Sequence, residues 1–366
     1  MHERIVAGDF PSAVYLLGAR GQAVFADALG DAVREPRQLP ATLETIYDLA
    51  SLTKPLVTGL LCAHYVEAGE LKLDAPVAAY LSEFDLADKR TITIRHLLTH
   101  TSGLPAWRPL YLIAGSKGDA LAAIAREPLA TNPGARVVYS DLGFITLGFI
   151  LQQITGSNLE VIAHEQIFAP LRLTRTFFNP EKAAQTGIAA CETGNGYERE
   201  MCARDFPAKR YESWREQTVW GEVHDGNAYF LGGVAGHAGL FSSALETLKI
   251  CNQFIASQSQ ILKPETCQIF QQNLTDGLNE ARSFAWQLAM TNESTAGPGL
   301  PPNAFGHTGF TGTSCWIDGE AARVFILLTN RTHARALPFA NINSVRRTFH
   351  TLAVKAFESE DAVPIG

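Results

Sequence analysis

The stretch Tyr47-Asp48-Leu49-Ala50-Ser51-Leu52-Thr53-Lys54 places a serine and a lysine three residues apart, where an apolar helical pattern begins. Residues three apart on a helix lie on one face, so the Ser51 hydroxyl and the Lys54 amine are within reach of one another. A serine nucleophile needs such a neighbouring base. An ordinary helix start, with Ser51 as a cap and Lys54 in solvent, explains an isolated pair better. Other residues must therefore decide between the two interpretations.

The residues after Ser51 predict one buried helix of about 17 residues. Its apolar positions follow helical spacing up to Ala68, and Gly69 stands where a left-handed C-cap is usual. Pro55 cannot donate a hydrogen bond to the carbonyl group at position 51, and its ring crowds that group. We therefore expect the first turn of this helix to be irregular.

Two further short motifs accompany the serine and the lysine. Tyr139-Ser140-Asp141 follows a turn, and His307-Thr308-Gly309 precedes a C-terminal hairpin pattern. Together, in this order and at these separations, the three motifs resemble the serine β-lactamase and penicillin-binding-protein superfamily, and most of all its class C, esterase and D-peptidase branch. The segments 94–104 and 232–242 resemble other markers of that family.

The resemblance implies a mechanism. Ser51 attacks a carbonyl group to form an acyl-enzyme, Lys54 accepts the serine proton, and Tyr139 relays it to the leaving group and later helps to activate water. The backbone N–H groups of Ser51 and Phe310 would hold the oxyanion. Thr308 and Gly309 would contact substrate. No metal or cofactor is implied, and we expect structural hydrogen bonds rather than a metal at His224-Asp225 and His237.

The proposed base requires a particular environment. An exposed lysine has a pKa of ~10.4, whereas a base that works near neutral pH needs ~7 to 8. Burial and neighbouring groups would have to supply the difference of roughly 3 to 5 kcal/mol. We therefore expect Lys54 to be buried and its pKa to be lowered.

Two residues depart from the pattern of the β-lactamases. His307 stands where they have lysine, and Asp141 where class C enzymes have asparagine, so the site should be less cationic by nearly two charges. We predict weak binding of penicillins and of D-alanyl-D-alanine, both of which carry a carboxylate, although Arg331 could replace the missing cation. Because an anion next to Lys54 would raise its pKa, we expect Asp141 to pair with His307 or to point away.

The alternation of strand and helix patterns predicts an α+β fold of the β-lactamase type. A hairpin over 12–28, strands over 312–318 and 323–329 and a helix over 343–357 suggest an antiparallel sheet built from both ends of the chain and flanked by helices. We expect one α/β domain over 1–73 and 241–366 and a mainly helical domain over 74–240. The active site would lie between them.

Composition narrows the range of partners. The net charge of -7 and the pI near 5.8 give no reason to expect nucleic acid or an anionic membrane. A small molecule or a short peptide suits the chain better. No apolar stretch is long enough to span a bilayer. The numbered sequence shows no secretion signal, so we expect a cytoplasmic protein, or a periplasmic or secreted one if a signal was removed. Its oligomeric state is not predicted.

The sequence thus predicts a serine hydrolase of esters or amides. Within this class, an esterase or a D-peptidase or amidase ranks above a true β-lactamase. Two alternatives stay open. One is a catalytically idle relative that binds a peptide or a penicillin as a sensor. The other is an acyltransferase that uses the same acyl-enzyme but excludes water.

Overall fold

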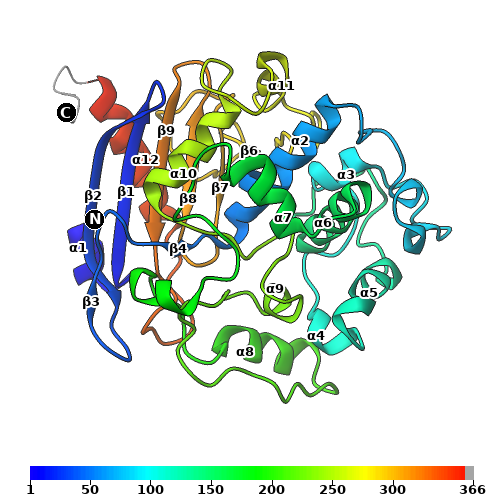
Figure 1. Cartoon of the computed structure of the whole chain (residues 1–366), viewed down its shortest axis with the longest axis horizontal. Helices are drawn as coiled ribbons and strands as arrows, with labels where there is room; N and C mark the ends of the chain where they lie inside the picture. The colour runs from blue at the N-terminus through cyan, green and yellow to red at the C-terminus, as the bar shows by residue number, and fades with distance from the viewer. Residues whose placement is uncertain (359–366) are drawn as a thin grey trace.

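The computed structural model describes residues 1–358, and a seven-stranded antiparallel sheet forms its centre (Figure 1). The strand order is β3-β2-β1-β9-β8-β7-β6. Strand β1 from the N-terminal part pairs with β9 from the C-terminal part, which joins the two ends of the chain in one sheet. The strands are β1 (Ser12–Ala19), β2 (Gln22–Val33), β3 (Leu39–Pro40), β6 (Gln287–Leu288), β7 (Phe305–Thr308), β8 (Ser314–Asp318) and β9 (Arg323–Thr329).

Helices cover both faces of this sheet. Figure 1 shows α10 (Ala244–Cys251) and α12 (Asn343–Glu358) on opposite sides of it. Because successive side chains of a strand point to opposite faces, Leu16 and Ile326 join the large core on the α10 side. Their chain neighbours Leu17 and Phe325 pack in a second core against α12. The predicted α+β fold, an antiparallel sheet flanked by helices, is confirmed.

The mainly helical segment between β4 (Tyr47–Asp48) and β5 (Phe241–Ser242) lies beside the sheet and contributes side chains, Asp141 among them, to a cleft (Figure 1). Its longest helix, α6 (Asp141–Thr155), is preceded by the N-cap residue Ser140, whose hydroxyl accepts from the Gly143 N–H at 3.2 Å. The other helices are α1 (His2–Val6), α2 (Leu60–Glu67), α3 (Ile94–Leu98), α4 (Leu110–Ile113), α5 (Ala120–Arg126), α7 (Leu159–Ala163), α8 (Gly196–Asp205), α9 (Gly226–Phe230) and α11 (Pro264–Ile269).

The segment after Ser51 is less regular than a single helix. A 3₁₀ turn over Ala50–Leu52 is followed by a π-helical stretch over Lys54–Gly59 and only then by α2. This agrees with the irregular first turn expected from Pro55, which cannot join an α-helical hydrogen-bond ladder at that point. The 17-residue helix predicted from the sequence is therefore divided into three pieces.

Other predicted elements agree closely with the structure. The N-terminal hairpin is β1 and β2, and the strand predicted over 323–329 is β9. The strand predicted over 312–318 begins only at Ser314, because Gly312 takes a left-handed backbone (φ +114°) in the preceding turn. All six cysteines are buried and unpaired. Among the described helices, none is long and apolar enough to cross a membrane.

Candidate active site

Ser51 lies at the wall of a cleft of about 740 Å³. Short strands β4 (Tyr47–Asp48) and β5 (Phe241–Ser242) pair just before it and bring the chain to the cleft. Ala50 then adopts a left-handed backbone with φ +48°, and its N–H donates to Asp48 Oδ1 at 2.8 Å. Such a backbone is strained for a residue other than glycine, so the Asp48 side chain helps to hold the turn that presents Ser51.

Lys54 is fully buried, as the sequence predicts, and polar groups surround its ammonium group. Nζ donates to Ser51 Oγ at 2.9 Å and to the His237 carbonyl oxygen at 3.1 Å. It also forms an ion pair with Asp141 Oδ1 at 2.7 Å. The serine and the lysine are therefore in direct contact, and a carboxylate completes the group.

The expectation of a lowered Lys54 pKa is wrong. Burial by itself lowers the pKa of this amine, but the negative charge of Asp141, together with Tyr139 and the hydrogen bonds of both, outweighs it, so the pKa lies above its ordinary value. The expectation that Asp141 pairs with His307 or points away is also wrong, because its carboxylate forms an ion pair with Lys54. Asp141 stands at the first position of α6, and from there it reaches Lys54.

Tyr139 lies against the same pair. Its hydroxyl is hydrogen-bonded to Lys54 and Ser51, and its ring packs on the buried His100 ring with centroids 4.6 Å apart. The Lys54 Nζ lies 5.0 Å from the ring centroid. Burial raises the pKa of Tyr139 although Lys54 opposes the change. At neutral pH Tyr139 therefore keeps its proton and can donate it.

His307 lies at the end of β7 with its ring 5.6 Å from that of Tyr139. Its Nδ1–H donates to the Thr308 carbonyl oxygen at 2.8 Å. Burial, together with the positive charges of Arg282 and Lys54, holds the pKa of His307 well below its ordinary value. The ring is neutral near pH 7, so it does not supply the charge of the lysine that β-lactamases have here.

The turn after His307-Thr308-Gly309 is fastened to the segment that carries Ser51. Thr311 Oγ1 donates to the Asp48 carbonyl oxygen at 2.7 Å, and Thr313 Oγ1 donates to the Leu49 carbonyl oxygen at 3.0 Å. Gly309 makes this approach possible, since a Cβ there would lie 2.6 Å from the Leu49 oxygen. Two parts of the chain about 260 residues apart thus form one rigid wall.

Arg331 also forms hydrogen bonds that hold this turn in place. Its Nε donates to the Phe310 carbonyl oxygen at 2.7 Å, its Nη1 donates to the Ala340 carbonyl oxygen at 2.8 Å, and the guanidinium lies 4.9 Å from the Phe310 ring centroid. It lines the cleft, but much of its hydrogen-bonding capacity is used by the backbone. The sequence suggested it as the replacement for the missing lysine; in the structure it mainly holds the turn.

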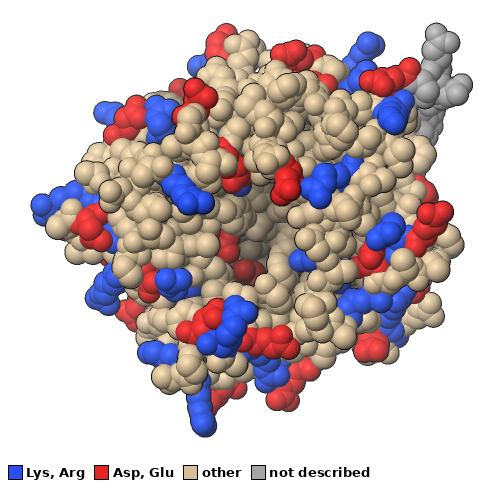
Figure 2. Space-filling view, turned by 180° about the vertical axis from the view of Figure 1, so that it is seen from behind, with Lys and Arg blue, Asp and Glu red and all other residues tan. Residues whose placement is uncertain are grey.

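Sequence reasoning missed several residues of the cleft, among them the acidic side chains Glu198 and Asp225. Figure 2 shows a hollow with acidic side chains in its depth. Burial and the charge of Asp225 raise the pKa of Glu198 to about 7. Asp225 itself stays ionised, because its contact with His237 lowers its pKa in spite of burial. Only their position in the folded chain, and no local motif, brings these carboxylates to the cleft that Ser51 lines.

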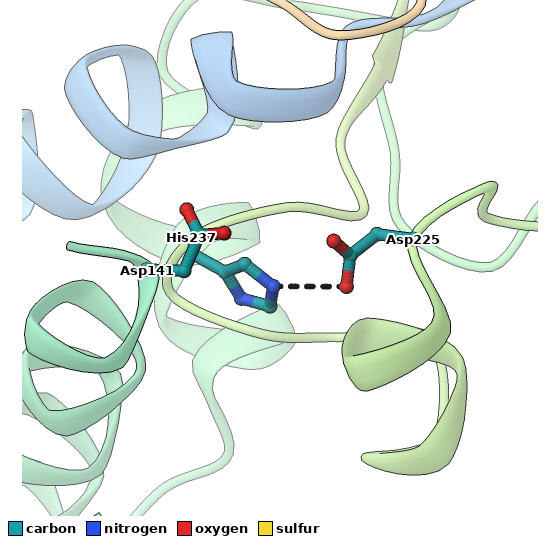
Figure 3. Close-up of side chains that lie close together, drawn as sticks. All are labelled: Asp141, Asp225 and His237. Atoms are coloured by element: carbon teal, nitrogen blue, oxygen red, sulfur yellow. Dashed lines mark hydrogen bonds and ion pairs between the residues drawn. The ribbon is translucent and has the colours of Figure 1, made fainter. Parts of the chain in front are cut away.

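Asp141, Asp225 and His237 form the one cluster in the described part of the chain whose ligand atoms, all within 4.8 Å, could hold a metal (Figure 3). His237 Nε2 and Asp225 Oδ1 are hydrogen-bonded at 2.9 Å, which is the structural role we expect for them. The Asp141 carboxylate contacts the Lys54 ammonium group, so the lysine already provides a cation for this cluster.

Comparison with known proteins agrees with this geometry. The family described as "Beta-lactamase" matches residues 2–345. A protein of Escherichia coli K12 named "Putative D-alanyl-D-alanine carboxypeptidase" is 33% identical over 355 residues, which are 89% of this chain and 79% of that protein. An N-acetylmuramyl-L-alanine amidase of Bacillus subtilis is 30% identical over 364 residues, 91% of this chain and 80% of that protein.

Solved structures share the fold. A mutant of a class C β-lactamase superposes with a TM-score of 0.72 at 16% identity, over 97% of this chain and 94% of its own. EstCE1, a hydrolase with promiscuous acyltransferase activity, gives a TM-score of 0.72 at 23% identity, over 95% and 96%. The chain therefore belongs to the beta-lactamase family, and it is a serine hydrolase.

Gly309→Ala tests the fastening of the turn. The new Cβ would lie 2.1 Å from Thr313 Oγ1 and 2.6 Å from the Leu49 oxygen, so the turn must move away from Ser51. We expect kcat/KM to fall about 10²-fold, because misplacements of about 1 Å have such effects. Gly187→Ala is the control, since a Cβ there meets nothing within 4 Å. Full activity of Gly309→Ala with a model ester would contradict the role given to this contact.

Proposed function

We propose that the protein hydrolyses small esters or amides through an acyl-enzyme on Ser51. The observation that carries this proposal is the direct contact of Lys54 Nζ with Ser51 Oγ at 2.9 Å inside the cleft. A serine hydroxyl becomes a useful nucleophile when a neighbouring base takes its proton. The intact group of Ser51, Lys54 and Tyr139 favours an enzyme over a sensor without activity.

The base is the pair of Lys54 and Asp141 rather than the lysine alone. An ammonium group with a raised pKa cannot accept a proton unless it gives one away. When Ser51 Oγ attacks the carbonyl carbon, its proton passes to Nζ while a proton of Nζ passes to Asp141 Oδ1, 2.7 Å away. The lysine stays charged throughout, the carboxylate becomes neutral, and the negative charge moves to the oxyanion.

The oxyanion is held by the backbone N–H groups of Ser51 and Phe310. Collapse of the tetrahedral intermediate breaks the bond to the leaving group, which takes a proton from the Tyr139 hydroxyl. Lys54 restores that proton, and the proton on Asp141 returns to Lys54, so the proton lost by Ser51 ends on the leaving group. Water then attacks the acyl-enzyme carbonyl group; its proton passes to Tyr139 while the Tyr139 hydroxyl proton passes to Lys54 and a proton of Lys54 passes to Asp141. Collapse of this intermediate breaks the bond to the Ser51 oxygen, which takes a proton from Lys54 as Asp141 returns its own.

The charges of the cleft indicate the class of substrate. Beside Ser51, His307 is neutral and Lys54 is paired with Asp141, so neither is a free cation for a carboxylate close to the scissile bond, and Asp225 adds a negative charge. Arg331 and Arg346 also line the cleft, but both donate to carbonyl oxygens of the turn after β7. A neutral ester, an amide or a short peptide recognised by its amine suits the cleft better. The name of the Bacillus subtilis relative, an N-acetylmuramyl-L-alanine amidase, supports an amide related to the cell wall. D-Alanyl-D-alanine, after which the Escherichia coli relative is named, carries the carboxylate that this cleft disfavours, so it and β-lactams should be poor substrates.

Mass spectrometry tests the nucleophile. We expect a fluorophosphonate, and at least one compound from a panel of esters, D-aminoacyl amides and penicillins, to add a covalent mass to Ser51. Ser51→Ala should show none of these additions. A folded wild-type protein that reacts with no compound would exclude the proposed activity. An added alcohol or amine that outcompetes water as acceptor would instead identify an acyltransferase.

Asp141→Asn tests the paired base. In the wild type Lys54 can pass a proton to the Asp141 carboxylate, 2.7 Å away, so it need not lose one to solvent before it acts. In the variant a free Lys54 must lose its own proton before it can act. We therefore expect the rising limb of the profile of kcat/KM against pH to move to higher pH.

The same profile can refute this mechanism. If neutral Lys54 alone is the base of the wild type, removal of the carboxylate lowers the lysine pKa, and the rising limb moves to lower pH. An unmoved limb would show that the two groups are not coupled. Asp276→Asn, at an exposed carboxylate, is the matched control and should leave the limb where it is.

A further inference from the structure

Arg346, in the first turn of α12, reaches the turn that follows β7. Its side chain is buried, with 5% of the residue exposed. Nη2 donates to the Gly309 carbonyl oxygen at 2.7 Å and to the Thr313 carbonyl oxygen at 2.9 Å, while Nη1 donates to Asn343 Oδ1 at 2.9 Å. Gly309 and Thr313 are the two ends of the turn, so one guanidinium group closes it.

The Gly309 carbonyl group and the Phe310 N–H belong to one peptide unit. Because this unit is planar and trans, its C=O and N–H bonds point in opposite directions. A donor that fixes the carbonyl therefore also fixes the direction of the N–H. A charged donor makes a stronger hydrogen bond, and it polarises the peptide so that the N–H at the far end becomes a better donor.

We propose that Arg346 is a positioning residue, which orients and polarises the Gly309–Phe310 peptide so that the Phe310 N–H stabilises the oxyanion. The inference rests on the proposed function, in which this N–H is one of the two donors. Arg346 does not touch the substrate in this role; its effect passes through the Gly309 carbonyl oxygen.

Arg331, the other arginine at this turn, contacts a different peptide unit from Arg346. Arg331 binds the Phe310 carbonyl oxygen, which belongs to the next peptide unit, and the N–H of that unit is that of Thr311. Arg331 can therefore hold the turn but cannot polarise the Phe310 N–H. Burial, with the charge of Arg331 nearby, lowers the pKa of Arg346 only to about 9, so it is charged at neutral pH.

The test measures the carbonyl group of the acyl-enzyme itself. A slowly hydrolysed ester with a ¹³C-labelled carbonyl is used to trap the acyl-enzyme on Ser51, and its stretching frequency is measured by infrared difference spectroscopy. In Arg346→Met we expect a shift to higher wavenumber, because weaker hydrogen bonds polarise the carbonyl less. We also expect kcat to fall about tenfold, less than the ~10²–10³-fold loss for removing a whole donor, with little change in KM.

Two further variants complete the experiment. Arg347→Met, at the next residue of α12, removes a partly exposed arginine whose Nη1 donates to the Glu293 carbonyl oxygen, and it should change neither frequency nor rate. Arg346→Lys keeps the charge but has a different donor geometry, so it should give a smaller shift. It serves as the test where thermal unfolding shows that Arg346→Met is not folded.

The possible results separate the inference from the proposed function. An unchanged carbonyl frequency in a folded Arg346 variant overturns the inference, whether kcat falls or not, since a rate loss without a shift shows a purely structural role. If the wild-type protein forms no acyl-enzyme on Ser51, the proposed function fails instead. A shift together with a lower kcat and a normal KM supports Arg346 as the positioning residue.

Discussion

The buried ammonium group of Lys54 is the constraint on which the site depends. A charge without solvent must be paired and hydrogen-bonded, or the fold pays a penalty of several kcal/mol. Lys54 meets this requirement with Asp141, Ser51 and the His237 carbonyl oxygen, which come from three different parts of the chain. The lysine thus ties α6 and the loop before β5 to the segment of Ser51, and the same contacts join the groups of the proposed proton transfer.

The proposed mechanism also requires a rigid place for the oxyanion. Thr311 and Thr313 hold the turn after β7 against the segment that presents Ser51, and Gly309 permits the close contact. Arg331 and Arg346 fix two carbonyl groups of this turn from outside. Donors that are already in place need not reorganise during the reaction, which is the main source of stabilisation in sites of this kind.

The sequence predicts the fold and the reacting groups because both have local signatures. The N-terminal hairpin follows from alternating apolar residues, and the irregular turn after Ser51 follows from Pro55. Ser51, Tyr139 and His307 stand in short motifs whose order identifies the family. The division into two domains at 73/74 and 240/241 stays a prediction. So do the roles of the individual site residues.

The direction of the Lys54 pKa could not be obtained in this way. It depends on where Asp141 points from the start of α6, and the sequence left pairing with His307 as an option. The buried position of Glu198, the contact of Asp225 with His237 and the reach of Arg346 to Gly309 join residues far apart in the chain. No local pattern encodes such distances, since they arise from tertiary packing.

Direct observation of the Lys54 amine tests whether it stays charged beside Asp141 at neutral pH. With lysine labelled at Cε and Nζ, NMR can follow the protonation of this side chain against pH, and Lys54→Arg assigns its signal. Because Asp141 raises the pKa of Lys54, we expect an ammonium group throughout the neutral range, which titrates above the ordinary range for lysine. A signal that shows a neutral amine near pH 7 to 8 would contradict the pairing with Asp141 as the basis of catalysis.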